Sequence, residues 1–106
     1  MHLVVFPAKD VDATKKLFTT LLGTEPYADQ PYYVGFRAGD IEFGLDPNAT
    51  DGPICYWEVE DIDATVQSLE AAGGEIREAP HEVGGGKSVA TVKDTNGNII
   101  GLSTAP

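Results

Sequence analysis

An internal repeat constrains this chain more than any other feature of its sequence. Asp10-Val11-Asp12-Ala13-Thr14 recurs 51 residues later as Asp61-Ile62-Asp63-Ala64-Thr65. A glycine follows at the same distance in each copy, as Gly23 and as Gly74. Self-similarity at a fixed spacing indicates two copies of one structural unit. Since 106 residues suit one domain of ordinary size, we expect both copies to share a single domain.

Each copy has the pattern of a strand followed by a helix. An apolar run of strand length, at residues 3–6 and 54–59, precedes the repeated Asp. Asp10 and Asp61 are expected to cap the first free N–H groups of the helices. Apolar residues at spacings of three and four then predict a buried stripe in each helix. The stripe comprises Val11, Thr14, Leu17, Phe18, Leu21 and Leu22 in the first helix, and Ile62, Val66, Leu69 and Gly73 in the second.

Further strands are expected after each helix. Residues 32–37 and 41–45 flank a tight turn, as do residues 88–93 and 99–103, and residues 75–83 form another strand with a weaker counterpart at 26–29. The predicted fold is therefore α+β, with two βαβββ modules that form a curved half-barrel sheet with helices on its outer face. Module one covers residues 1–46, a polar, proline-bounded linker covers 47–53, and module two covers 54–106.

Two segments carry a resemblance to a known family. Residues 16–26, Lys-Leu-Phe-Thr-Thr-Leu-Leu-Gly-Thr-Glu-Pro, look like the end of the first helix in the vicinal oxygen chelate superfamily, which includes glyoxalase I, extradiol dioxygenases and bleomycin-resistance proteins. Residues 94–100, Asp-Thr-Asn-Gly-Asn-Ile-Ile, resemble that family's turn into its final strand. Together with the paired βαβββ plan, the resemblance covers nearly the whole chain and implies a cavity that binds a small molecule.

The resemblance also implies a divalent metal, held by His and Glu side chains of the first and last strand of each module. The first-strand position, seven residues before the repeated Asp, is Leu3 in one module and Ile54 in the other. The last-strand position is assigned to Gly101 in module two and to Glu42 in module one. Only His2 and Glu42 remain as weak metal candidates, whereas such sites usually need three or more protein ligands. We therefore expect no cofactor, with a divalent metal as the alternative.

Strand alternation predicts which side chains line the cavity. If Leu3 and Ile54 face it, then Val5, Tyr56 and Glu58 do too, whereas Phe43, Leu45, Cys55 and Trp57 face the helices, and Trp57 is expected in the core. The register of residues 32–37 stays open, and His81 is expected at the cavity rim. The predicted ligand-binding residues are Tyr33, Arg37, Glu42, Tyr56, Glu58 and Gly101.

Charge and composition exclude several classes of partner. Seven basic and seventeen acidic residues give a net charge of −10, which repels nucleic acids and anionic membrane surfaces. The single cysteine, Cys55, excludes an internal disulfide, and the first residues lack the basic and apolar regions of an export signal. We therefore expect a cytoplasmic protein.

Three interpretations of function follow. The first is a metal-free protein that binds a planar or cationic small molecule by stacking and cation–π contacts, as the bleomycin-resistance branch of the family does, and that forms a homodimer. The second is a metal-dependent glyoxalase-like lyase or isomerase. The third is an interaction module with a vestigial pocket.

Overall fold

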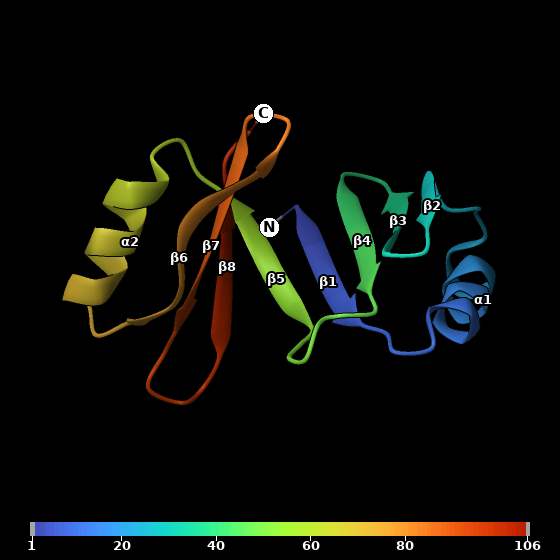
Figure 1. Cartoon of the computed structure of the whole chain (residues 1–106), viewed down its shortest axis with the longest axis horizontal. Coiled ribbons are helices and arrows are strands. Elements are labelled where there is room, and N and C mark those ends of the chain that lie inside the picture. The colour runs from blue at the N-terminus through green and yellow to red at the C-terminus, as the bar shows by residue number, and fades with distance from the viewer. Residues whose placement is uncertain (1, 106) are drawn as a thin grey trace. The chain divides into compact units, whose positions relative to one another are not determined.

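The first half of the chain forms a compact unit with one helix and four strands. In the computed structural model, which describes residues 2–105, this unit is Met1–Ile54. Its strands lie in the order β2-β3-β4-β1, with β1 parallel to β4 (Figure 1). The elements are β1 (Leu3–Pro7), α1 (Val11–Leu22), β2 (Ala28–Gln30), β3 (Tyr33–Ala38) and β4 (Ile41–Asp46).

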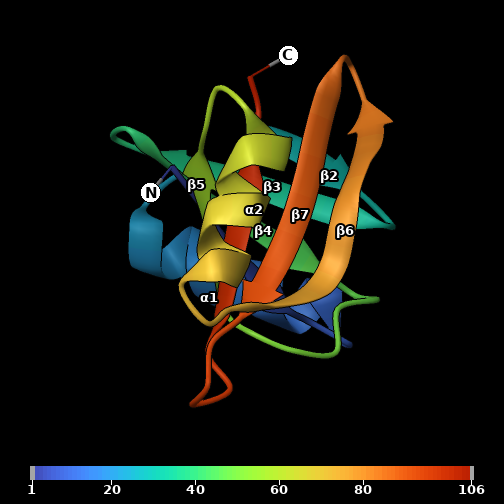
Figure 2. The same ribbon diagram turned by 90° about the vertical axis from the view of Figure 1, so that its left-hand side faces the viewer.

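The second unit, Cys55–Pro106, repeats this plan. Its strands lie in the order β5-β8-β7-β6, with β5 parallel to β8. Figure 2 shows α2 in front of β7 and β8, so that the helix covers one face of the second sheet. The elements are β5 (Ile54–Glu58), α2 (Ile62–Ala71), β6 (Glu75–Gly84), β7 (Lys87–Lys93) and β8 (Ile99–Ser103). The two predicted βαβββ modules are confirmed, including the weak strand expected near residues 26–29.

The repeated Asp residues begin both helices in the same way. Oδ1 of Asp10 accepts a hydrogen bond from the backbone N–H of Ala13 at 3.1 Å, and Oδ1 of Asp61 accepts one from Ala64 at 3.0 Å. Each bond satisfies a helical N–H group that lacks an intrahelical partner. The predicted capping role is confirmed, and the Asp repeat is a folding signal.

Each unit has its own core between helix and sheet. In the second unit Ile62 and Val66 of α2 pack on Ala90, Val92 and Leu102, as the predicted stripe requires. In the first unit the core is aromatic: the rings of Phe6, Phe36 and Phe43 lie 5.1–6.4 Å from the ring of Phe18.

The predicted stripe of α1 is partly wrong. Val11, Phe18 and Leu22 pack on the core, but Leu17 is 71% exposed and Leu21 is 76% exposed. Six apolar or Thr positions make a stripe wider than the surface that this short sheet offers. The side of the helix that carries Phe18 therefore packs on the sheet, and the side that carries Leu17 remains exposed to solvent.

Strand pairing defines the face of each sheet that points away from the helix, here called the helix-free face. In the first unit the core residues Val34, Phe36 and Leu45 mark the helix side. Alternation then places Tyr33 and Arg37 on the helix-free face, together with Glu42, the register partner of Arg37. The register of residues 32–37, which the sequence left open, is thereby settled.

Trp57 departs from its predicted place in the core. It pairs with the buried Leu102 and so belongs to the helix side of the sheet, as alternation indicated. Its side chain is nevertheless 50% exposed, so it is not part of the buried core. Within residues 2–105 no helix combines the length and the apolar character needed to span a bilayer.

Candidate functional site

Tyr27, Arg37 and Glu42 form a polar cluster on the helix-free face of the first unit. The Tyr27 hydroxyl donates a hydrogen bond of 2.6 Å to Oε1 of Glu42, and Nη2 of Arg37 lies 3.2 Å from the same oxygen. The guanidinium also stacks over the Tyr27 ring, with its central carbon 4.5 Å from the ring centroid. The carboxylate of Glu42 is therefore oriented by two donors and partly neutralised by Arg37.

The hydrogen bond to Glu42 also affects the ionisation of Tyr27. Partial burial of the phenol and the negative charge of Glu42 raise the pKa of Tyr27 far above its usual value. The phenol therefore stays a hydrogen-bond donor over the whole physiological pH range. Tyr27 was absent from the predicted site, and the only signal for it was the weak strand pattern that begins beside it.

Tyrosine rings cover glycines on this face. The Tyr27 ring lies over Gly35, and the Tyr33 side chain lies over Gly44, so that its hydroxyl would collide with any Cβ at that position. Gly35 and Gly44 are register partners on β3 and β4. Because neither glycine has a side chain, Tyr27 and Tyr33 can lie directly on the backbone of β3 and β4.

The second unit carries the same motif. The ring of Tyr56 lies over Gly101, its register partner on β8, where an added Cβ would be 2.6 Å from Cδ1 of the ring. Thr91 of β7 pairs with Gly101 from the other side and is only 2% exposed. A ring, a glycine and a buried hydroxyl therefore lie in one row across three neighbouring strands.

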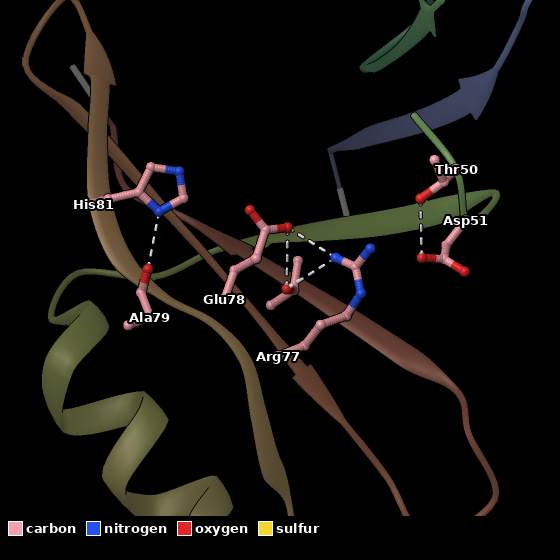
Figure 3. Close-up of polar contacts among 7 residues, drawn as sticks. Thr50, Asp51, Arg77, Glu78, Ala79 and His81 are labelled. Carbon is pink, nitrogen blue, oxygen red and sulfur yellow. Dashed lines mark hydrogen bonds and ion pairs between the residues drawn. The ribbon is translucent and has the colours of Figure 1, made fainter. Parts of the chain in front are cut away.

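Arg77 and Glu78 of β6 extend this row. Nη1 of Arg77 lies 2.8 Å from Oε1 of Glu78 and 3.3 Å from the Thr91 hydroxyl, which in turn donates to Oε1 of Glu78 at 3.4 Å (Figure 3). Neighbouring strand residues normally point to opposite faces. Here the pairing of β6 with β7 shifts on both sides of Glu78, and such bulges re-aim side chains.

The remaining predicted residues take positions on the same face of the second unit. Glu58 pairs with Ser103, whose side chain is completely buried, and both follow the Tyr56–Gly101 pair by two residues. His81 pairs with Val89 at the exposed part of β6, and its Nδ1 lies 2.9 Å from the carbonyl oxygen of Ala79. Tyr33, Arg37 and Glu42 thus share a face in the first unit, and Tyr56, Glu58 and Gly101 share one in the second.

The register corrects one assignment of the metal positions. Val5 and Tyr56 stand at equal distances before the two capping Asp residues, and their partners are Gly44 and Gly101. The counterpart of Gly101 is therefore Gly44, and Glu42 lies two residues earlier, opposite Leu3. The sequence misassigned Glu42 because the two final turns differ in length.

The residues at these positions do not fit the metal that the resemblance implies. Gly44 and Gly101 have no ligating side chain, and tyrosines occupy the space in which one would stand. Glu42 accepts bonds from Tyr27 and Arg37, and His2 adjoins Leu3, so alternation directs it to the opposite face. Among residues 2–105 no group of three or more His, Cys, Asp or Glu side chains is arranged to hold a metal ion.

A hollow on the helix side of the second unit lies apart from these residues. It measures about 190 Å³ and lies between the end of α2 and the turn after β7. Its lining is mainly apolar and includes Leu69, Gly74, Val92 and Ile100. A Cβ at Gly74 would clash with Val92 and with the Leu69 carbonyl oxygen, so only glycine fits this close approach of the chain to β7. The hollow includes none of the six predicted ligand residues.

Comparisons with known proteins agree with the fold. A family model described as "Glyoxalase/Bleomycin resistance protein/Dioxygenase superfamily" matches residues 1–102. A search of the curated proteins gives no significant match.

Solved structures at low sequence identity share the fold over nearly the whole chain. A structure described as an NAD-dependent benzaldehyde dehydrogenase from Legionella pneumophila has 18% identity over 98% of each chain and a TM-score of 0.77. A glyoxalase/bleomycin resistance protein/dioxygenase superfamily member from Vibrio splendidus 12B01 has 17% identity over 96% of this chain and 95% of the other, with a TM-score of 0.76. A Mn(II)-bound glyoxalase from Novosphingobium aromaticivorans has 22% identity and a TM-score of 0.72, over 97% of this chain and 38% of the other. At these identities the likeness concerns the fold.

Proposed function

Because the chain belongs to the glyoxalase/bleomycin resistance protein/dioxygenase superfamily, we propose that it is a small-molecule-binding protein that binds a planar or cationic ligand without a metal. The observation that carries the proposal is the pair of tyrosines on Gly44 and Gly101. These side chains supply aromatic surface at the positions where the family's carboxylate ligands are expected. The same space thus suits stacking in place of metal coordination.

The chemistry of both helix-free faces suits such a ligand. Tyr33 and Tyr56 offer rings for stacking, and Arg37 with Glu42 offers a fixed donor and acceptor beside the first ring. Glu58 adds a carboxylate two residues beyond Tyr56, and Gly101, which has no side chain, lets the Tyr56 ring lie on the backbone of β8. Since Arg37 partly neutralises Glu42, cation capture rests mainly on Glu58 and on the net charge of −10.

A thermal-shift screen tests the binding function. The protein is dialysed against a chelator and screened with planar cationic and planar neutral aromatic compounds. A compound at 100 times its dissociation constant should add about 2.7 kcal/mol to the free energy of unfolding. Tyr33→Ala should reduce the ligand-induced shift. Tyr32→Ala is the matched control, because Tyr32 lies just before β3 and is 66% exposed.

Two results would contradict the proposal. A broad panel without any thermal shift would favour an interaction module over a binding protein. Retention of about one equivalent of Mn, Fe, Ni or Zn per chain after untagged purification would favour the metal-dependent lyase or isomerase. The homodimer stays a prediction, and sedimentation that yields only an 11.3 kDa species at micromolar concentration would contradict it.

A further inference from the structure

Side chains from three strands meet on the helix-free face of the second unit. The Tyr56 ring extends from β5 over Gly101 of β8, and the Arg77–Glu78 pair extends from β6 to Thr91 of β7. Gly101 and Thr91 are register partners on adjacent strands, which are about 4.8 Å apart. The aromatic ring and the carboxylate therefore lie at neighbouring positions on the adjacent strands β8 and β7, although they come from β5 and β6, the outermost strands of the unit.

Glu78 is held in a fixed orientation with one oxygen available. Both of its contacts, from Arg77 and from Thr91, end on Oε1. Figure 3 shows the dashed lines on that oxygen, and among the described residues Oε2 has no hydrogen-bond partner. The Glu78 side chain is 49% exposed, so that a small molecule can reach it. A carboxylate oriented in advance loses little freedom when it accepts a further hydrogen bond.

We infer that Glu78 is a specificity-determining residue of the binding site, where it accepts hydrogen bonds from the N–H groups of a planar ligand stacked on Tyr56. The inference rests on the proposed binding function and adds the chemical class of the ligand: an aromatic ring whose edge carries an amidinium, amine or similar N–H donor. A cationic donor forms the strongest bond with a carboxylate. Arg77 partly neutralises Glu78, so the selection rests on hydrogen bonding: an anionic edge group such as a carboxylate has no hydrogen to donate to Oε2.

Three compounds that share one ring and differ in the edge group test this inference. Benzamidine carries a cationic double donor, benzamide a neutral amide, and benzoate an anionic acceptor. Dissociation constants are measured by NMR titration of the full chain. We expect benzamidine to bind most tightly and benzoate most weakly. Glu78→Gln should weaken benzamidine by about tenfold or more and change benzamide by about twofold at most.

The control variant is Glu82→Gln, which removes the same charge from the same strand. Glu82 pairs with Ser88 and follows His81 by one residue, away from the Tyr56 row. It should leave all three dissociation constants unchanged. Amide spectra of both variants, compared with those of the unchanged protein, verify that each is folded.

The outcomes separate this inference from the binding function itself. Equal affinity for the three compounds, or equal effects of Glu78→Gln and Glu82→Gln, would overturn the role of Glu78 and leave the binding function standing. Failure of all three compounds to bind would also overturn the assigned ligand class. The binding function is overturned only when the broad thermal-shift panel also gives no response.

Discussion

The ring of Tyr56 lies on Gly101, and an added Cβ at Gly101 would be 2.6 Å from Cδ1, 2.7 Å from Cγ and 2.8 Å from Cε1 of that ring. Cγ is bonded directly to the Cβ of Tyr56. This part of the ring therefore cannot move away from Gly101 without a change of rotamer or backbone. The glycine and the tyrosine thus depend on each other. Their pairing accounts for a strand glycine, which would otherwise weaken the sheet.

Gly101→Ala should lower the free energy of unfolding by about 1–3 kcal/mol, because the added methyl overpacks the contact with Tyr56. Gly44→Ala is the matched comparison. There the colliding group is the hydroxyl end of Tyr33, which can swing away, and alanine restricts the unfolded chain. Its effect should therefore be smaller than about 1 kcal/mol. Urea unfolding of both variants measures the difference.

A double-mutant cycle identifies the cause of the Gly101→Ala effect. In a Tyr56→Ala background, Gly101→Ala should cost close to nothing, because the ring is absent. If the cost were the same in both backgrounds, the contact with Tyr56 would not be its origin.

The Tyr27–Glu42 hydrogen bond predicts a loss of stability at alkaline pH. Since the pKa of Tyr27 is raised in the folded protein, the native state keeps a proton that the unfolded chain releases near its usual pKa of about 10. The contribution to stability is complete below that pH and decreases as the pH rises above it. Tyr27→Phe should reduce this decrease, as measured by urea unfolding at a series of alkaline pH values. An identical pH dependence in both proteins would contradict the bond's role.

Local signals in the sequence were sufficient for most of the fold. Asp10 and Asp61 act within their own helices, so their capping role can be predicted without knowledge of the tertiary structure. The equal spacing of the two copies then predicts the same succession of strands and helix along each half of the chain.

The site depended on information that local patterns do not contain. Tyr27 and Glu42 are fifteen residues apart, and their contact follows from the pairing of β2, β3 and β4. Alternation alone would have placed Arg77 and Glu78 on opposite faces of the sheet. They reach the same face because the pairing of β6 with β7 is bulged. The sequence named Tyr56 and Gly101 as candidate ligand-binding residues, but it indicated neither their pairing nor Glu78.

The turn between β7 and β8 depends on Asp94. Its carboxylate accepts hydrogen bonds of 2.8 Å from the backbone N–H of Asn96, the backbone N–H of Asn98 and the Asn98 side chain. The bonds from Asn98 lower the pKa of Asp94, so their contribution is present above the usual pKa and is lost as the pH falls through the lowered value. Asp94→Ala should speed amide hydrogen exchange at Asn96 and Asn98. Asp40→Ala in the β3–β4 turn should leave that exchange unchanged, and equal effects would contradict the assignment.

Adjacent residues of α1 should differ sharply in their contribution to stability. Phe18 lies among three aromatic rings of the first core, and Phe18→Ala should cost about 3 kcal/mol or more through the cavity it leaves. Leu17 is 71% exposed, and Leu17→Ala should change the free energy of unfolding by less than about 0.5 kcal/mol, since alanine also favours the helix. Urea unfolding compares the two. A cost of Leu17→Ala near that of Phe18→Ala would mean that another surface covers Leu17, and that the helix uses the full stripe its sequence predicts.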